Sequence, residues 1–112
     1  MKALPAALSL AIILAACTRS DTVTDVTLAE LAARQHAYDG QTVRTRGTVR
    51  SFDSPRHYWL EDDHLNRVGL TPVEHIAPHL DRQVTVVGRY TFTRDRGRRI
   101  VLEAIEAYDP PR

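Results

Sequence analysis

Cysteine and lysine are almost absent from this sequence. Cys17 is the one cysteine among 112 residues, which excludes an intramolecular disulfide and a thiolate metal cluster. Lys2 is the one lysine among 15 basic residues, so the chain beyond residue 16 carries 14 arginines against 14 acidic residues and is formally neutral. Bulk charge therefore predicts no polyanion partner, and nucleic acid is not expected, although a neutral chain can still carry a local basic face.

Catalytic, cofactor and metal motifs are also missing. Ser51 and Ser54 lie outside any nucleophile-elbow motif, and the sequence has no glycine-rich phosphate loop. His75 and His79 have the spacing of a helical metal pair, but Pro78 between them disfavours helical geometry. We therefore expect no catalytic residue, no metal site, no cofactor and no enzymatic activity.

An apolar run follows Lys2 and ends at Cys17, and this layout predicts a secretory signal. The run is too short for a membrane span, which needs about 20 apolar residues. Its last residues, Leu14-Ala15-Ala16-Cys17, resemble the lipobox of bacterial lipoproteins.

The lipobox resemblance implies a signal peptide over residues 1–16 and acyl chains, such as palmitate, on Cys17. Two or more acyl chains on one residue hold a protein stably at a membrane. Thr18 after the cysteine implies, in family terms, the outer membrane. The expected location is the bacterial cell envelope, at the outer membrane and facing the periplasm.

The remaining chain divides into a tether over residues 17–26, one domain over residues 27–109 and a tail over residues 110–112. Thr27-Leu28-Ala29-Glu30 matches a capping box and predicts a helix from Leu28 to about Ala37. A second capping box, Thr71-Pro72-Val73-Glu74, predicts a short helix that ends near Ala77.

Alternating polarity from Gln41 onward predicts five strands. Val43, Thr45, Gly47 and Val49 share one face of the first strand, and Gly47 is expected at a bulge or a sharp bend. The strands are expected over residues 41–52, 57–61, 67–70, 82–93 and 98–108, and the residues expected to be buried are Val43, Val49, Leu60, Val84, Val86 and Leu102.

The element order resembles the OB-fold, a small five-stranded Greek-key barrel with an N-terminal helix here and a short helix between strands 3 and 4. The resemblance lies in three segments: Gly40 to Val49, Tyr58 to Asp62 and Gln83 to Tyr90. They are similar to the tRNA anticodon-binding domains and to the OB-fold domains of small exported bacterial proteins. The fold class is therefore expected to be mainly β.

OB-folds commonly bind ligands across strands 2 and 3 and between the two loops that join strands 1 to 2 and 4 to 5. The resemblance places an arginine cluster at that mouth of the barrel, opposed in the loops by Asp53 and Asp95. It suits a phosphate, a carboxylate or an acidic protein surface, and the alternative is a solvated loop tip. The candidate residues from these loops are Arg56, His57, Arg94, Arg96, Arg98 and Arg99.

Trp59, the only tryptophan, completes the set of candidate ligand-binding residues. Alternation places it opposite Tyr58 and Leu60, either exposed beside the first strand's arginines Arg44, Arg46 and Arg50, where it would stack a base or sugar, or packed under the N-terminal helix.

The sequence thus predicts a lipid-anchored binding module of the cell envelope, with an envelope protein as the partner and an anionic oligomer, saccharide or nucleic acid, as the alternative.

Overall fold

The structure, a computed structural model, describes residues 22–109. The predicted signal peptide and Cys17 lie outside these residues, as does the tail 110–112. The elements are β1 (Thr24–Asp25), α1 (Leu28–Ala33), β2 (Thr42–Asp53), β3 (Arg56–Glu61), β4 (Arg67–Thr71), α2 (Val73–Ile76), a 3₁₀ turn (Ala77–His79), β5 (Gln83–Thr93) and β6 (Gly97–Ala107).

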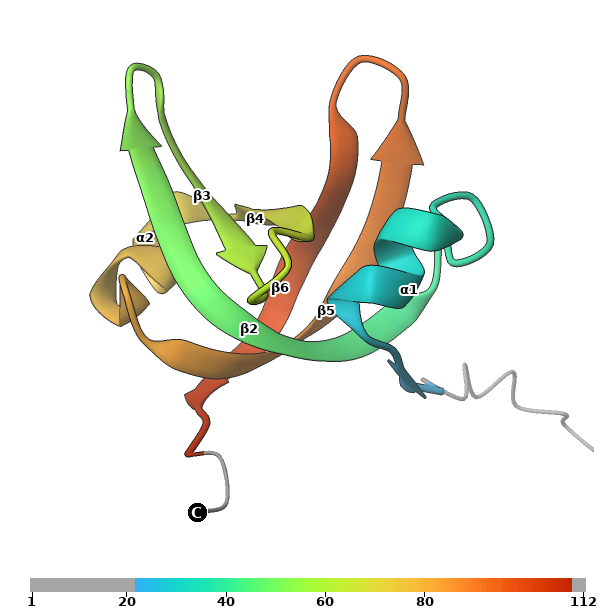
Figure 1. The fold of residues 1–112 in the computed structure, drawn as a ribbon, viewed down its shortest axis with the longest axis horizontal. Coiled ribbons are helices and arrows are strands. Elements are labelled where there is room, and N and C mark those ends of the chain that lie inside the picture. The colour runs from blue at the N-terminus through green and yellow to red at the C-terminus, as the bar shows by residue number, and fades with distance from the viewer. Residues whose placement is uncertain (1–21, 110–112) are drawn as a thin grey trace, which may run out of the picture.

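The sheet closes on itself to form a barrel. Its strand order is β1-β2-β3-β4-β6-β5, and β2 also pairs with β5, so five strands complete the circle and β1 adds to the edge of β2. The pairs are antiparallel except β1 with β2 and β4 with β6. Figure 1 shows the two hairpins, β2–β3 and β5–β6, pointing to the same end of the barrel with their tips apart, and α1 and α2 lower on its flanks.

Alternation along the strands builds the core. Val43, Thr45 and Val49 point inward from β2, as the period-two pattern predicts for a half-buried strand. Leu28 and Leu31 of α1 join this core. The apolar face of the helix is therefore buried without a contact to Trp59. Of the residues expected to be buried, Val43, Val49, Leu60, Val84 and Val86 are fully buried, and Leu102 is only partly buried.

Two glycines allow the barrel to curve. A Cβ at Gly47 would lie 2.8 Å from the Glu61 carbonyl oxygen, so the bend of β2 needs a residue without a side chain. No register shift occurs there. The bulge lies instead in β6, where Glu103 is the extra residue opposite the step from Val87 to Gly88 of β5, and it shifts the alternation of β6 beyond Leu102.

Other element boundaries also differ from the sequence prediction. The Thr27 hydroxyl accepts a hydrogen bond from the Glu30 amide as predicted, but α1 ends at Ala33 rather than near Ala37. Residues 34–40 form turns instead of continuing the helix. The Tyr90 hydroxyl donates to the Gln35 carbonyl oxygen in these turns at 2.9 Å.

Thr71 is not the cap of α2. It pairs with Val101 at the end of β4, so Pro72 takes the N-cap position and makes no side-chain cap. The predicted tether is also shorter among the described residues, because Thr24 and Asp25 form β1 and Val26 is buried. Among residues 22–109, no helix has the length and apolar character needed to cross a membrane.

Candidate functional site

A groove runs over the outer face of β3 and β4 to the tips of the two hairpins. It has a volume of about 620 Å³, within the range typical of ligand sites. We call it the hairpin groove. Its lining residues are Phe52, Arg56, His57, Tyr58, Trp59, Arg67, Gly69, Leu70, Thr71, Val73, Arg96, Arg98 and Arg99.

The floor of the groove follows from strand register. Arg50, Trp59, Gly69 and Arg99 are successive cross-strand partners on β2, β3, β4 and β6. Gly69 has no side chain, and a Cβ there would lie 3.3 Å from Arg99 Cγ. The Arg99 side chain therefore lies against the space that a side chain at position 69 would fill, on the strand next to Gly69.

Three aromatic rings line one wall. Phe52 is paired with His57 across the hairpin, and their ring centroids are 5.9 Å apart. His57 and Trp59 stand on the same face of β3 with centroids 5.4 Å apart. Phe52 is 56% exposed. The row therefore presents ring faces and edges to solvent at spacings typical of interacting aromatic side chains.

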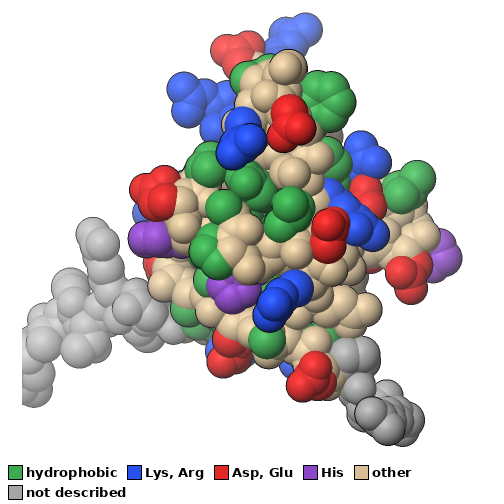
Figure 2. All heavy atoms as spheres, turned by 90° about the vertical axis from the view of Figure 1, so that its left-hand side faces the viewer, with side chains coloured by type: hydrophobic (Ala, Val, Ile, Leu, Met, Phe, Trp, Pro, Cys, Tyr) green, Lys and Arg blue, Asp and Glu red, His purple; other side chains and the backbone are tan. Residues whose placement is uncertain are grey.

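The groove is electropositive. Its lining includes five arginines and no carboxylate. Within residues 22–109, Arg96, Arg98 and Arg99 form no ion pair, and Arg56 has only a 3.9 Å contact with Asp53. Figure 2 shows basic side chains gathered around the end of the molecule that carries the hairpin tips, with hydrophobic side chains among them and some carboxylates.

Arg67 is the exception, because its charge is largely compensated. Its Nε donates to Glu61 Oε1 at 2.6 Å, and its guanidinium lies 5.1 Å from the centre of the Trp59 ring. Glu61 also accepts from Trp59 Nε1 at 3.4 Å. The Arg67 hydrogen bond holds the pKa of Glu61 below its ordinary value, against burial that raises it. The Glu61 hydrogen bond and the Arg67 guanidinium together hold the Trp59 ring in its orientation.

Replacing Arg67 by Gln is expected to raise the pKa of Glu61. The pKa is depressed in the folded state, so the carboxylate stabilises the fold above its unfolded pKa, and this contribution is lost as pH falls through the folded pKa. An NMR titration of the Glu61 carboxyl carbon measures the shift. Arg56→Gln, which does not contact Glu61, should leave the midpoint where it is; an equal midpoint in the Arg67 variant would contradict this assignment.

The structure brings most of the candidate residues together. Arg56, His57, Trp59, Arg96, Arg98 and Arg99 all line the hairpin groove, and Arg94 does not. Trp59 is half-buried on the outer face of β3 rather than packed under α1. Of the three β2 arginines expected beside it, Arg50 is its cross-strand partner.

The other two β2 arginines lie elsewhere. Arg44 pairs with Asp25 on β1, and Arg46 contacts Thr85 and the Tyr108 ring. Phe52 and Arg67 also line the groove, although the sequence pattern did not single them out. The available signal was the strand alternation, which puts Phe52 on the outer face of the first strand. Within residues 22–109, no three His, Cys, Asp or Glu side chains are grouped so as to hold a metal ion.

Comparison with known proteins yields structural neighbours only. No family model and no curated protein sequence matches the chain. One similar solved structure is Replication protein A of U. maydis bound to single-stranded DNA, with a TM-score of 0.53 and 21% identity over 78% of this chain and 73% of that one. Another is a protein assigned as an aspartyl-tRNA synthetase of Leishmania major Friedlin, with a TM-score of 0.51, 17% identity and 75% coverage of this chain. This chain covers only 20% of that protein.

The barrel topology and these neighbours define the chain as an OB-fold domain, and the predicted fold class is confirmed. The expectation that nucleic acid is an unlikely partner is wrong. It rested on the neutral bulk charge, whereas a protein with the same fold is seen bound to single-stranded DNA. The charge balance of the whole chain also conceals the local cluster of arginines in the hairpin groove.

Proposed function

We propose that this OB-fold domain binds a single-stranded anionic oligomer, nucleic acid in the first place, in the hairpin groove. The observation that carries the proposal is one surface that combines a row of three aromatic rings with five arginines and no lining carboxylate. The fold neighbour bound to single-stranded DNA adds support. The protein partner favoured by the sequence has no comparable observation behind it.

The two kinds of side chain suit the two parts of a nucleotide. Unpaired bases offer π faces to aromatic rings, and this stacking tolerates any base. Arginines bind phosphates through forked hydrogen bonds, and each phosphate neutralised releases counterions. In a duplex the base faces are already stacked, so the Phe52, His57 and Trp59 rings favour a single strand.

The proposal also covers the cellular location of the domain and its lack of catalytic activity. Residues 1–17 lie outside the described part of the chain, and their lipobox pattern supports a lipid anchor at Cys17 and a position at the bacterial cell envelope, at the outer membrane facing the periplasm. We also propose that the domain binds without catalysing a reaction. This proposal rests on the composition of the groove lining, which contains no serine, cysteine or carboxylate side chain, three common types of catalytic nucleophile.

Salt dependence tests the proposal. Affinity for a fluorescent oligothymidylate is expected to fall steeply with ionic strength. Replacing Arg96, Arg98 and Arg99 together by Gln should flatten the slope of log K against log salt by about 2, because each phosphate contact on a single strand contributes about 0.7. Fluorescence anisotropy over a salt series measures both slopes.

A charge-matched control removes three exposed arginines outside the groove, Arg34, Arg82 and Arg89. Its slope should match that of the unmodified chain. If a sulfated oligosaccharide bound more tightly than the oligonucleotide, the groove would be assigned to saccharide ligands instead of nucleic acid. Weak, salt-insensitive binding to every polyanion would refute the proposal and return the protein-interaction hypothesis to first place.

A further inference from the structure

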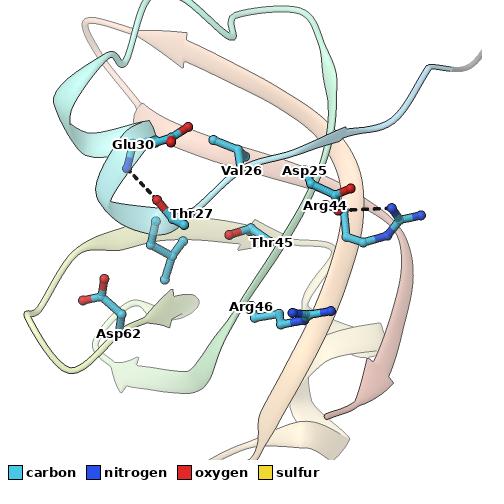
Figure 3. Close-up of a pocket in the computed structure, with 9 residues that line it drawn as sticks. Asp25, Val26, Thr27, Glu30, Arg44, Thr45, Arg46 and Asp62 are labelled. Atoms are coloured by element: carbon cyan, nitrogen blue, oxygen red, sulfur yellow. Dashed lines mark hydrogen bonds and ion pairs between the residues drawn. The ribbon is translucent and has the colours of Figure 1, made fainter. Parts of the chain in front are cut away.

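A second cavity lies on the other flank of the barrel, under the start of α1. Its volume is about 450 Å³, and it shares no lining residue with the hairpin groove. We call it the α1 cavity. Figure 3 shows its walls, which come from β1, the first turn of α1, β2 and the residue after β3. Its lining residues are Asp25, Val26, Thr27, Leu28, Glu30, Arg44, Thr45, Arg46 and Asp62.

The cavity lies where β2 lacks a strand neighbour. On one edge, β2 pairs with β1 at Val43 and Arg44 and with β3 from Thr48 onward. Residues 45–47 between these pairings have no strand beside them on that edge, although β5 pairs with them on the other. This gap in the sheet leaves room for a ligand between the end of β1 and the end of β3.

A buried hydroxyl in the gap has no partner. Thr45 is 2% exposed, and its Oγ1 makes no hydrogen bond among the described residues. Figure 3 shows this oxygen turned from β2 toward the α1 side of the cavity. An unpaired buried hydroxyl is costly in free energy, and a polar ligand in the cavity would remove that cost.

Of the three carboxylates that line the cavity, Asp25 is paired with an arginine and the other two are not, whereas both arginines of the lining are already engaged. Arg44 is paired with Asp25 at 3.1 Å, and Arg46 donates to Thr85 Oγ1 and lies against the Tyr108 ring. Figure 3 shows both guanidinium groups directed away from the α1 side of the cavity.

Glu30 and Asp62 take part in no ion pair within residues 22–109. The Glu30 carboxylate accepts one hydrogen bond, from the Tyr38 hydroxyl at 3.0 Å. Asp62 accepts from the backbone amide of His64 and from Asn66. Burial raises the pKa of Asp62, but the hydrogen bonds outweigh it and the pKa lies below its ordinary value, so this carboxylate stays ionised at neutral pH.

We infer that the α1 cavity binds a small organic cation that has a primary ammonium group on an apolar stem. The inference is drawn from the unpaired Thr45 hydroxyl, the two carboxylates without a cationic partner, and the apolar side chains of Val26 and Leu28. The ammonium group donates to Thr45 Oγ1 and faces the carboxylates of Glu30 and Asp62. The stem packs on Val26 and Leu28. This inference is independent of the hairpin groove and of what that groove binds.

Titration of the full chain with butylamine hydrochloride, followed by amide chemical shifts in ¹H–¹⁵N NMR spectra, tests the site. Saturable shifts are expected at Thr45, Arg46, Glu30 and Asp62. Thr45→Val keeps the shape and removes the acceptor, so binding should weaken about tenfold or more, as for loss of a hydrogen bond to a charged group. The melting temperature of Thr45→Val without ligand should be equal or higher, because no buried hydroxyl is left unpaired.

Glu30→Gln should weaken binding in the same way and carries the test if the Thr45 variant does not fold. Glu74→Gln on α2, outside the cavity, should bind as the unmodified chain does, and butan-1-ol should give no saturable shifts. If the Thr45 and Glu30 variants bound butylamine as tightly as the unmodified chain, the inference would be overturned. Shifts spread over other surfaces would overturn it too.

Discussion

Replacing Val86 by Asp is expected to abolish folding of the barrel. Val86 is fully buried on β5, between Thr45 of β2 and Ile105 of β6. A carboxylate there has no cationic partner, and an unpaired buried charge costs several kilocalories per mole. Domains of this size have about 5–15 kcal/mol of stability in total. Far-UV circular dichroism and thermal melting of the purified variant measure the result.

Val101→Asp provides the matched control. Val101 lies in β6 of the same barrel but is 49% exposed, so the same substitution leaves its charge in water and should keep a cooperative melting transition. If the Val86 variant melted as cooperatively as the Val101 variant, the inward direction assigned to Val86 would be wrong.

Replacing Trp59 by Ala is expected to remove most of the binding in the hairpin groove. Trp59 is the largest ring of the aromatic row and is held between His57 and the Arg67 guanidinium. Stacking of one base contributes about 1–3 kcal/mol, so the Kd for a short oligothymidylate should rise about 5- to 150-fold. Anisotropy at fixed salt measures the change.

Two further variants separate stacking from general damage. Trp59→Phe retains a ring and should recover part of the affinity. Tyr108→Ala removes a ring that contacts Arg46 outside the groove and should leave the Kd unchanged. A salt slope that stays the same in Trp59→Ala would show that the lost energy is not electrostatic; unchanged affinity in that variant would remove Trp59 from the site.

The sequence predicted the barrel because its signals are local and repeated. Alternation along β2 placed Val43, Thr45 and Val49 inside, and the capping residue Thr27 marked the start of α1. The errors came from long-range contacts. The turns after α1 contact Tyr90 through the Gln35 carbonyl, 55 residues away along the chain, and no local pattern contains that information.

The sequence predicted which loops contribute to the candidate site, but not the direction in which each side chain of those loops points. Arg96, Arg98 and Arg99 were placed correctly by assigning two loops to one end of an OB-fold. Alternation alone puts Phe52 on the outer face of the first strand, but its place beside His57 in the groove depends on the register of the hairpin, and Phe52 was therefore missed. Arg94 was included although the direction of a loop side chain follows no period. The α1 cavity could not be predicted from the sequence, because it arises from a gap between two strand pairings.

The short strand β1 fixes where the chain enters the domain, and this decides which end of the barrel would face a membrane if the proposed anchor at Cys17 is present. In Figure 1 the chain joins the barrel through β1 below α1, at the end away from the two hairpin tips. Cys17 precedes Thr24 by seven positions, a contour of at most about 25 Å. An acylated Cys17 would therefore keep the base of the barrel close to the lipid headgroups, with the hairpin groove directed outward into the aqueous phase, where a long flexible strand has room to enter from either side.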